Sequence, residues 1–150
     1  MKAEGGYTYL TMLIVVFTVT LAAQATWVPA STVSIRAKEQ ELIFRGQAYQ
    51  AAISSYYLAD PKNPSFPRSL EDLLDDPRFS GRRHIRSLYD DPISRGQWSV
   101  ITGEGGITGV ASTSDRQPLK VSGFPYGLEN FDNSVAYSDW HFVFVVAEKY

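Results

Sequence analysis

Apolar side chains are concentrated in one segment near the start of the chain. Residues 7–35 carry no charge, and residues 10–23, LTMLIVVFTVTLAA, form its most hydrophobic part. A helix over residues 7–28 would be about 33 Å long, which matches the hydrocarbon core of a bilayer. Its Leu, Ile, Val and Phe side chains favour insertion by roughly 3 to 5 kcal/mol before the threonines and Gln24 are counted against it. The pattern predicts a membrane-length helix whose insertion is marginal.

Residues 31–58 show the periodicity of an amphipathic helix. The apolar positions at helical spacing are Ile35, Leu42, Ala48, Tyr49, Ala52, Ile53 and Tyr56. We expect this face to pack on a sheet. The charged and polar positions are expected to form a solvated face, and they are Arg36, Lys38, Glu39, Glu41, Arg45 and Gln50. Pro29, just before this segment, predicts either a kink or restart of the helix or a membrane-exit turn.

Two short helices are expected after a turn-rich stretch at residues 60–67. The first begins with Ser69 as N-cap, followed by Asp72 three residues on, and ends at Pro77. The second covers residues 82–89 and is stopped by the Asp-Asp-Pro sequence that follows.

Strand patterns occupy the C-terminal third of the chain. Residues 97–102 and 107–112 read as a β-hairpin through the glycine-rich turn at 103–106. Residues 137–147 read as a third strand with alternating inward aromatic side chains. Residues 113–136 form a long irregular link, which in a small domain is usually a binding loop or an assembly surface. The expected fold class is α+β, with a long N-terminal helix packed on a small antiparallel sheet.

Composition narrows the function classes. A chain of 150 residues that is 44% hydrophobic and 20% charged has room for one compact domain plus an appendage. A net charge of −2, with cations interspersed among anions, gives no basic stripe, so no nucleic-acid partner is expected. The absence of cysteine excludes a disulfide framework, a thiolate nucleophile and a sulfur-ligated zinc site.

No pattern for catalysis stands out. His84 and His141 lie far apart in the sequence, and the common nucleophile, phosphate-loop and metalloprotease motifs are missing. Asp75-Asp76 and Asp90-Asp91 each precede a proline, which is ordinary turn chemistry rather than a pair of catalytic carboxylates. The chain is therefore predicted not to be an enzyme.

Three hypotheses fit the N-terminal segment: a cleaved secretory signal with its small-residue site at 23–25, a plain signal anchor, or a pilin-type signal. Residues 5–10, GGYTYL, place a glycine before an aromatic residue and an apolar helix. This arrangement resembles the signal of type IV pilins and type II secretion pseudopilins. The resemblance implies that prepilin peptidase cuts between Gly6 and Tyr7 and methylates the new N-terminus at Tyr7. In this family the fifth residue after the cut is usually Glu, whereas here it is Thr11.

The order of predicted elements is similar to the pseudopilin plan over nearly the whole chain. Residues 41–46, 49–53, 67–74 and 105–110 resemble segments of proteins akin to the major pseudopilin. The implied organisation is a leader at 1–6, a transmembrane and assembly helix at 7–30 and a periplasmic domain at 31–150. The residues expected to serve membrane anchoring and assembly are Leu10, Thr11, Leu13, Ile14, Val15, Val16, Phe17, Leu21 and Pro29.

The resemblance also implies location and partners. It implies a single-pass protein of the bacterial inner membrane that joins other pseudopilins in a periplasmic filament and works with an inner-membrane secretion platform. No cofactor is required, although major pseudopilins hold calcium before the last strand. The matching oxygen donors here are Ser112, Asp115, Asp132 and Asp139. Two alternatives remain: a minor pilin of a surface or competence pilus, and a membrane-tethered binding module whose loop at 123–135 captures a ligand with calcium.

Overall fold

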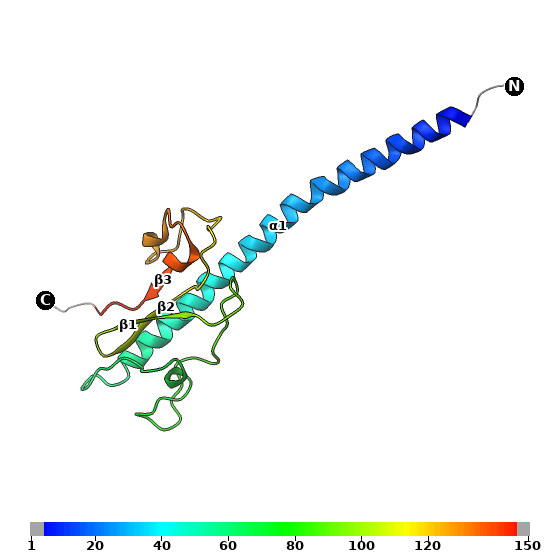
Figure 1. Ribbon diagram of the computed structural model, residues 1–150. Coiled ribbons are helices and arrows are strands. Elements are labelled where there is room, and N and C mark those ends of the chain that lie inside the picture. The colour runs from blue at the N-terminus through cyan, green and yellow to red at the C-terminus, as the bar shows by residue number, and fades with distance from the viewer. Residues whose placement is uncertain (1–4, 147–150) are drawn as a thin grey trace. The chain divides into compact units, whose positions relative to one another are not determined.

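The computed structural model describes residues 5–146, without the side chains of residues 5–6 and 24–31. The chain divides into two compact units, Met1–Ala37 and Lys38–Tyr150. Both units contain part of one helix, α1, which spans Gly5–Tyr57 (Figure 1).

Helix α1 covers both segments that the apolar pattern predicts to be helical. Its bounds include Pro29, so the expected restart of the helix and the expected membrane-exit turn are both wrong, and a kink at that residue stays a prediction. Proline lacks an N–H and crowds the carbonyl four residues earlier, which weakens a helix without always ending it. The helical state of residues 31–57 is confirmed.

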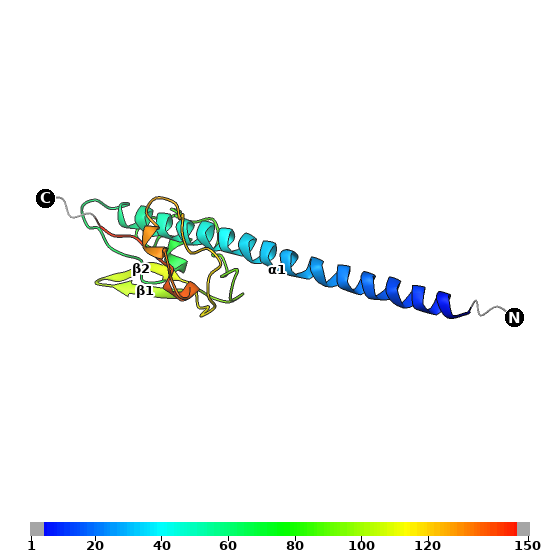
Figure 2. The same cartoon turned by 90° about the horizontal axis from the view of Figure 1, so that it is seen from above.

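The second unit is an α+β structure in which the C-terminal part of α1 lies beside a three-stranded antiparallel sheet (Figures 1 and 2). The strands are β1 (Ser99–Gly103), β2 (Gly106–Ala111) and β3 (His141–Val143), in the order β1-β2-β3. The predicted hairpin is confirmed, with a register shift between Ile101 and Thr102. The hairpin turn places Gly105 at φ +95, a conformation that favours glycine.

The core of this unit lies between α1 and the sheet. Leu42 and Ile53 of α1 are fully buried, as are Val110 of β2 and Phe142 of β3. Gly46 lets the strand approach the helix closely, because a Cβ atom at this position would lie 2.4 Å from the Phe142 ring. The expected inward face of residues 31–58 is therefore confirmed from Leu42 onward, whereas Ile35 is exposed.

The two predicted short helices are largely wrong. The first reduces to a single 3-10 turn, η1 (Glu71–Leu73), whose N-cap is Leu70 and not the predicted Ser69, although Asp72 does accept the N–H and the hydroxyl of Ser69. Residues 82–89 form no helix. The N–H groups of His84 and Ile85 instead donate to the carbonyl of Leu73. These bonds to a distant residue take the place of the hydrogen bonds that a helix would form within the segment.

The predicted third strand at 137–147 is also too long. A 3-10 turn, η3 (Tyr137–Asp139), precedes β3, whose three residues are followed by one further bond from Phe144 N to Thr108 O. The expected alternation is confirmed only over residues 140–142, where Trp140 and Phe142 are buried and His141 is exposed; residues 143 and 144 are both half-buried.

The link at residues 113–136 is irregular, as predicted, and it contributes to the core. It contains the 3-10 turn η2 (Glu129–Phe131), and both Leu128 and Phe131 are buried. The Phe131 ring stacks on Trp140, with ring centroids 5.6 Å apart and planes 4° apart. These contacts fix the link on the domain at its middle.

Candidate functional site

The first candidate site is the surface of α1 in the first unit. All side chains from residue 7 to residue 23 are exposed in this unit, and none is charged. Large apolar side chains occur all around the helix, with Leu10 56% and Phe17 61% exposed. A helix that is apolar around its whole circumference is normally covered by lipid or by other protein.

Threonines interrupt this apolar surface, and their hydroxyls are satisfied by the helix itself. Thr11 Oγ1 donates to the Tyr7 carbonyl at 2.7 Å, and Thr20 Oγ1 donates to the Val16 carbonyl at 2.7 Å. Thr18 makes the equivalent bond to Val15 at 2.9 Å. Such back-bonding lowers the cost of placing hydroxyl groups in an apolar environment. Among the described residues, no helix is both long enough and apolar enough to cross a membrane.

The residues predicted to be processed lie at the start of α1. Gly6 is described only by its backbone, and Tyr7 is 77% exposed. The side chain of Pro29 lies outside the described part of the chain. The remaining predicted assembly residues all lie on the exposed apolar surface of the first unit, which brings them onto one continuous helix.

A second feature is a buried carboxylate that sequence reasoning placed on the solvated face. Glu39 of α1 is only 2% exposed, which contradicts that expectation. Its Oε1 accepts the N–H of Leu119 at 2.6 Å, the N–H of Lys120 at 3.1 Å and the Tyr137 hydroxyl at 2.9 Å. Burial and the neighbouring carboxylate raise the pKa of Tyr137. Glu39 therefore joins residues 119–120 of the irregular link, and Tyr137 just after it, to the helix.

The four candidate calcium ligands have other partners or stand apart. Ser112 is buried and donates to Asp91, while Asp139 accepts the N–H groups of Val135 and Ala136. Asp115 accepts the Ser138 hydroxyl at 3.1 Å, and Asp132 is exposed. The described residues contain no group of three or more His, Asp or Glu side chains arranged for a metal ion. The calcium site stays a prediction.

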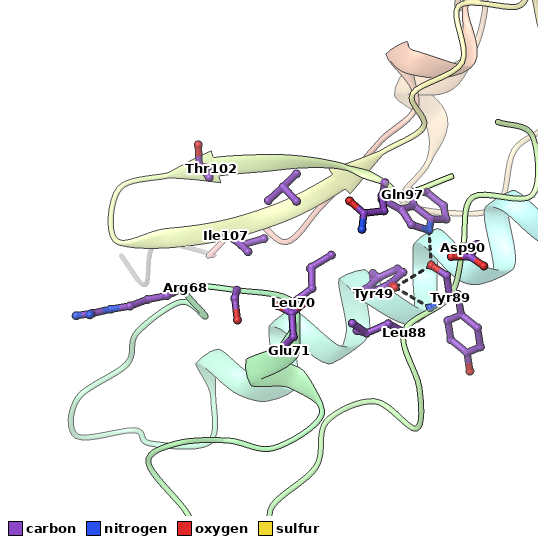
Figure 3. Close-up of a pocket in the computed structure, with 13 residues that line it drawn as sticks. Tyr49, Arg68, Leu70, Glu71, Leu88, Tyr89, Asp90, Gln97, Thr102 and Ile107 are labelled. Carbon is purple, nitrogen blue, oxygen red and sulfur yellow. Dashed lines mark hydrogen bonds between the residues drawn. The ribbon is translucent and has the colours of Figure 1, made fainter. Parts of the chain in front are cut away.

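A groove in the second unit has a volume of about 520 Å³ and lies between the β1–β2 hairpin and residues 68–71 and 88–90 (Figure 3). Tyr49 and Trp98 are buried beside it. The Tyr49 hydroxyl donates to the Tyr89 carbonyl at 3.0 Å and accepts the Tyr89 N–H at 2.8 Å, and Trp98 Nε1 donates to the same carbonyl at 3.0 Å. Burial raises the pKa of Tyr49. The wall at 88–90 is thus held by two side chains.

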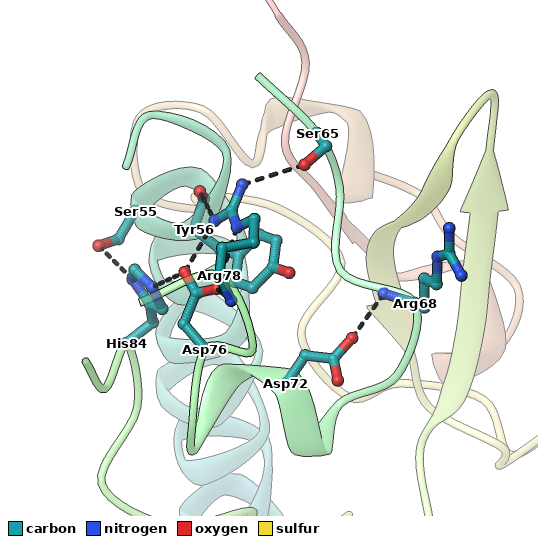
Figure 4. A network of polar contacts seen from close by, with 8 residues as sticks. All are labelled: Ser55, Tyr56, Ser65, Arg68, Asp72, Asp76, Arg78 and His84. Atoms are coloured by element: carbon teal, nitrogen blue, oxygen red, sulfur yellow. Dashed lines mark hydrogen bonds and ion pairs between the residues drawn. The ribbon is translucent and has the colours of Figure 1, made fainter. Parts of the chain in front are cut away.

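The residue pair Asp75-Asp76 does more than form a turn. Asp76 is 2% exposed, and its carboxylate accepts two bonds from the Arg78 guanidinium, at 3.0 and 2.8 Å (Figure 4). The guanidinium also lies 3.7 Å from the Tyr56 ring centroid and donates to the Tyr56 carbonyl. Hydrogen bonding from Arg78 holds the pKa of Asp76 well below its usual range.

The same cluster places a serine, a histidine and an aspartate in a row. Ser55 Oγ lies 2.8 Å from His84 Nδ1, and His84 Nε2 lies 3.1 Å from Asp76 Oδ2. This order resembles a nucleophile relay. However, the Asp76 carboxylate is also paired with the Arg78 guanidinium, which lies 2.8 Å away. We assign the cluster to holding residues 76–84 on the end of α1.

Asp91 is another buried carboxylate with several partners, although its position before a proline indicated only a turn. Its Oδ1 makes the expected turn bond to the N–H of Ile93 at 2.8 Å. Its Oδ2 also accepts the hydroxyls of Ser112 at 2.6 Å and Ser94 at 2.8 Å. The Asp-Pro pattern could have identified the turn, but the partner at position 112 follows only from the fold.

No protein-family model, curated protein or solved structure matches the chain.

Proposed function

We propose that the chain is a structural pilin-like subunit of the pseudopilin type, anchored in the bacterial inner membrane by residues 7–30. In this proposal, prepilin peptidase removes residues 1–6, and the mature subunit packs by its apolar helix into a short periplasmic filament that assists protein secretion. The second unit is then the periplasmic domain.

The observation that carries the proposal is the uncharged, apolar surface that surrounds α1 from residue 7 to residue 23. Water is a poor solvent for such a surface, and lipid or sister helices are the two environments that would cover it. Threonine hydroxyls bonded within the helix suit either environment, because they present few unpaired polar groups.

The sequence around residue 6 supports the same function. A glycine before the bond gives a protease an unhindered backbone, and the apolar helix follows immediately. We expect Gly6→Val to leave an uncleaved precursor, whereas Gly5→Val, its matched control, should mature normally. Intact-mass measurement of both variants separates the results, and normal maturation of Gly6→Val would refute the cut.

Thr11 replaces the glutamate that the resemblance implies at the fifth mature position. Its side chain has no carboxylate to pair with the terminal amine of a neighbouring subunit, and its hydroxyl donates to the Tyr7 carbonyl of its own helix. We therefore expect Thr11→Glu to increase subunit association in membranes, because an isolated amine in lipid gains a partner of opposite charge.

Cysteine cross-linking tests the packing step directly, since the chain contains no cysteine of its own. We expect Val16→Cys to form cross-linked dimers in membranes, with Lys62→Cys in the second unit as an exposed control. Monomers alone in the Val16→Cys variant would contradict assembly through this helix. Genome neighbourhood would distinguish a secretion filament from a surface or competence pilus.

A further inference from the structure

The second unit carries two charged loops of opposite sign. The basic loop, residues 77–89, contains Arg78, Arg82, Arg83 and Arg86 and no acidic residue. The acidic loop, residues 121–139, contains Glu129, Asp132 and Asp139 and no Lys or Arg. The chain's net charge of −2 conceals this separation.

The basic loop presents three unpaired guanidinium groups. Arg78 is taken up by Asp76, whereas Arg82, Arg83 and Arg86 are exposed and form no ion pair within the described residues. Guanidinium groups favour carboxylate partners because their planar fork can form two parallel hydrogen bonds.

The backbone of the basic loop is fixed at its base. Asp76 N donates to the Arg82 carbonyl at 3.0 Å, and Arg82 N donates to the Phe79 carbonyl at 3.2 Å. His84 is held between Ser55 and Asp76. The three exposed arginines therefore extend from an ordered segment, which reduces the entropy lost when they bind a partner.

The acidic loop is equally well supported. Phe131 is buried in the core, and the Glu129 carboxylate accepts the Gly127 N–H at 2.9 Å. Backbone hydrogen bonding lowers the pKa of Glu129, so this side chain stays ionised. Glu129, Asp132 and Asp139 are all exposed.

The two loops lie on opposite sides of the C-terminal part of α1. In Figure 1 the basic loop, in green, lies below the helix and the acidic loop, in orange, lies above it. They are therefore placed to meet between copies rather than within one copy. A contact between two different surfaces of the same chain is heterologous, and its repetition builds a filament instead of a closed pair.

We propose that the basic loop of one copy binds the acidic loop of the next copy, and that this contact sets the order of subunits along the filament. The inference rests on the proposed function, since it needs copies brought together by their helices. The basic loop offers three exposed cations and the acidic loop three exposed anions, and a residue of opposite charge borders each loop, Asp90 and Lys120 respectively.

Charge reversal with rescue tests the contact in the full chain in membranes. The yield of oligomers cross-linked through Val16→Cys is measured in each variant. We expect it to fall about tenfold in the triple variant Arg82→Glu, Arg83→Glu and Arg86→Glu. The double variant Glu129→Lys with Asp132→Lys should show the same loss. Combining both sets should restore the yield. Lys62→Glu, an exposed reversal outside both loops, should leave it unchanged.

Each result separates this contact from its alternatives. Unchanged yield in the arginine variant, or no rescue in the combined variant, would overturn the proposal. A loss in the arginine variant alone, matched by loss of binding to vesicles containing anionic phospholipid, would assign the basic loop to a membrane surface and also overturn it. If Val16→Cys forms no cross-linked dimers when both loops are unchanged, the proposed filament function is wrong. If it forms dimers whose yield is the same with and without the loop reversals, only the proposed loop contact is wrong.

Discussion

The Tyr137 hydroxyl donates to the Glu39 carboxylate at 2.9 Å, which joins the start of η3 to the helix residue 98 positions earlier. The same oxygen holds the N–H groups of Leu119 and Lys120. One buried carboxylate thus holds the irregular link at residues 119–120 and the turn that follows the link at Tyr137.

Removing this carboxylate should destabilise the second unit. We expect Glu39→Ala to lower the free energy of unfolding by about 3 kcal/mol, because three donors, among them the buried Tyr137 hydroxyl, lose their acceptor. Glu39→Gln, which keeps an acceptor oxygen, should cost about 1 kcal/mol. Urea unfolding of the full chain in detergent, followed by tryptophan fluorescence, measures both changes.

The matched control is Glu41→Ala. Glu41 pairs with Arg45 at 2.7 Å, but its side chain is 45% exposed. Its loss should cost less than about 0.5 kcal/mol. Equal effects of the substitutions at 39 and 41 would contradict the assigned role of Glu39.

Gly46 should tolerate no larger side chain. A Cβ atom at position 46 would lie 2.4 Å from the Phe142 ring, so Gly46→Ala should destabilise by about 2 kcal/mol even though alanine favours helices. Thermal unfolding by circular dichroism measures the change. In a Phe142→Leu background the penalty should shrink, and full additivity of the two substitutions would argue against the close contact.

Asp76 predicts a pH dependence. Its folded pKa is depressed by Arg78, so its contribution to stability is fully present above the unfolded pKa, about 3.9, and is lost as the pH falls through the folded pKa. Asp76→Asn should therefore cost about 3 kcal/mol at pH 6 and clearly less at pH 3. A gap between wild type and variant that stays constant over this range in urea titrations would show that the carboxylate charge is unimportant.

Tyr49→Phe should loosen the groove wall. The lost hydroxyl bonds both the N–H and the carbonyl of Tyr89, so we expect a loss of about 1 to 2 kcal/mol. Tyr126→Phe is the control, because Tyr126 is 99% exposed. Hydrogen exchange at the Tyr89 amide should quicken in the first variant only.

Periodic segments were predictable from the sequence, whereas contacts between distant residues were not. The apolar spacing of Leu42, Tyr49 and Ile53 indicated the buried helix face, and glycines between alternating positions indicated the hairpin. Glu39 lies three residues before Leu42 and so shares that face. Its charge suggested a solvated position, and its partners at 119, 120 and 137 depend on the folded link.

The wrong helix at 82–89 has a related cause. Ile85, Leu88 and Tyr89 have helical spacing, yet the amides of His84 and Ile85 are bonded to Leu73. Local spacing described which side chains would turn inward but not where the backbone donors would find acceptors. The burial of Asp76 and Asp91 was not predicted for the same reason. Each carboxylate has a partner outside its own turn, His84 for Asp76 and Ser112 for Asp91.

The N-terminus of the mature protein tests the central proposal most directly. Mass spectrometry of the native protein from membranes should find a chain that begins at an N-methylated Tyr7 and retains the apolar part of α1. A chain that retains Met1, or one that begins after residue 25 with the apolar helix removed, would contradict the account.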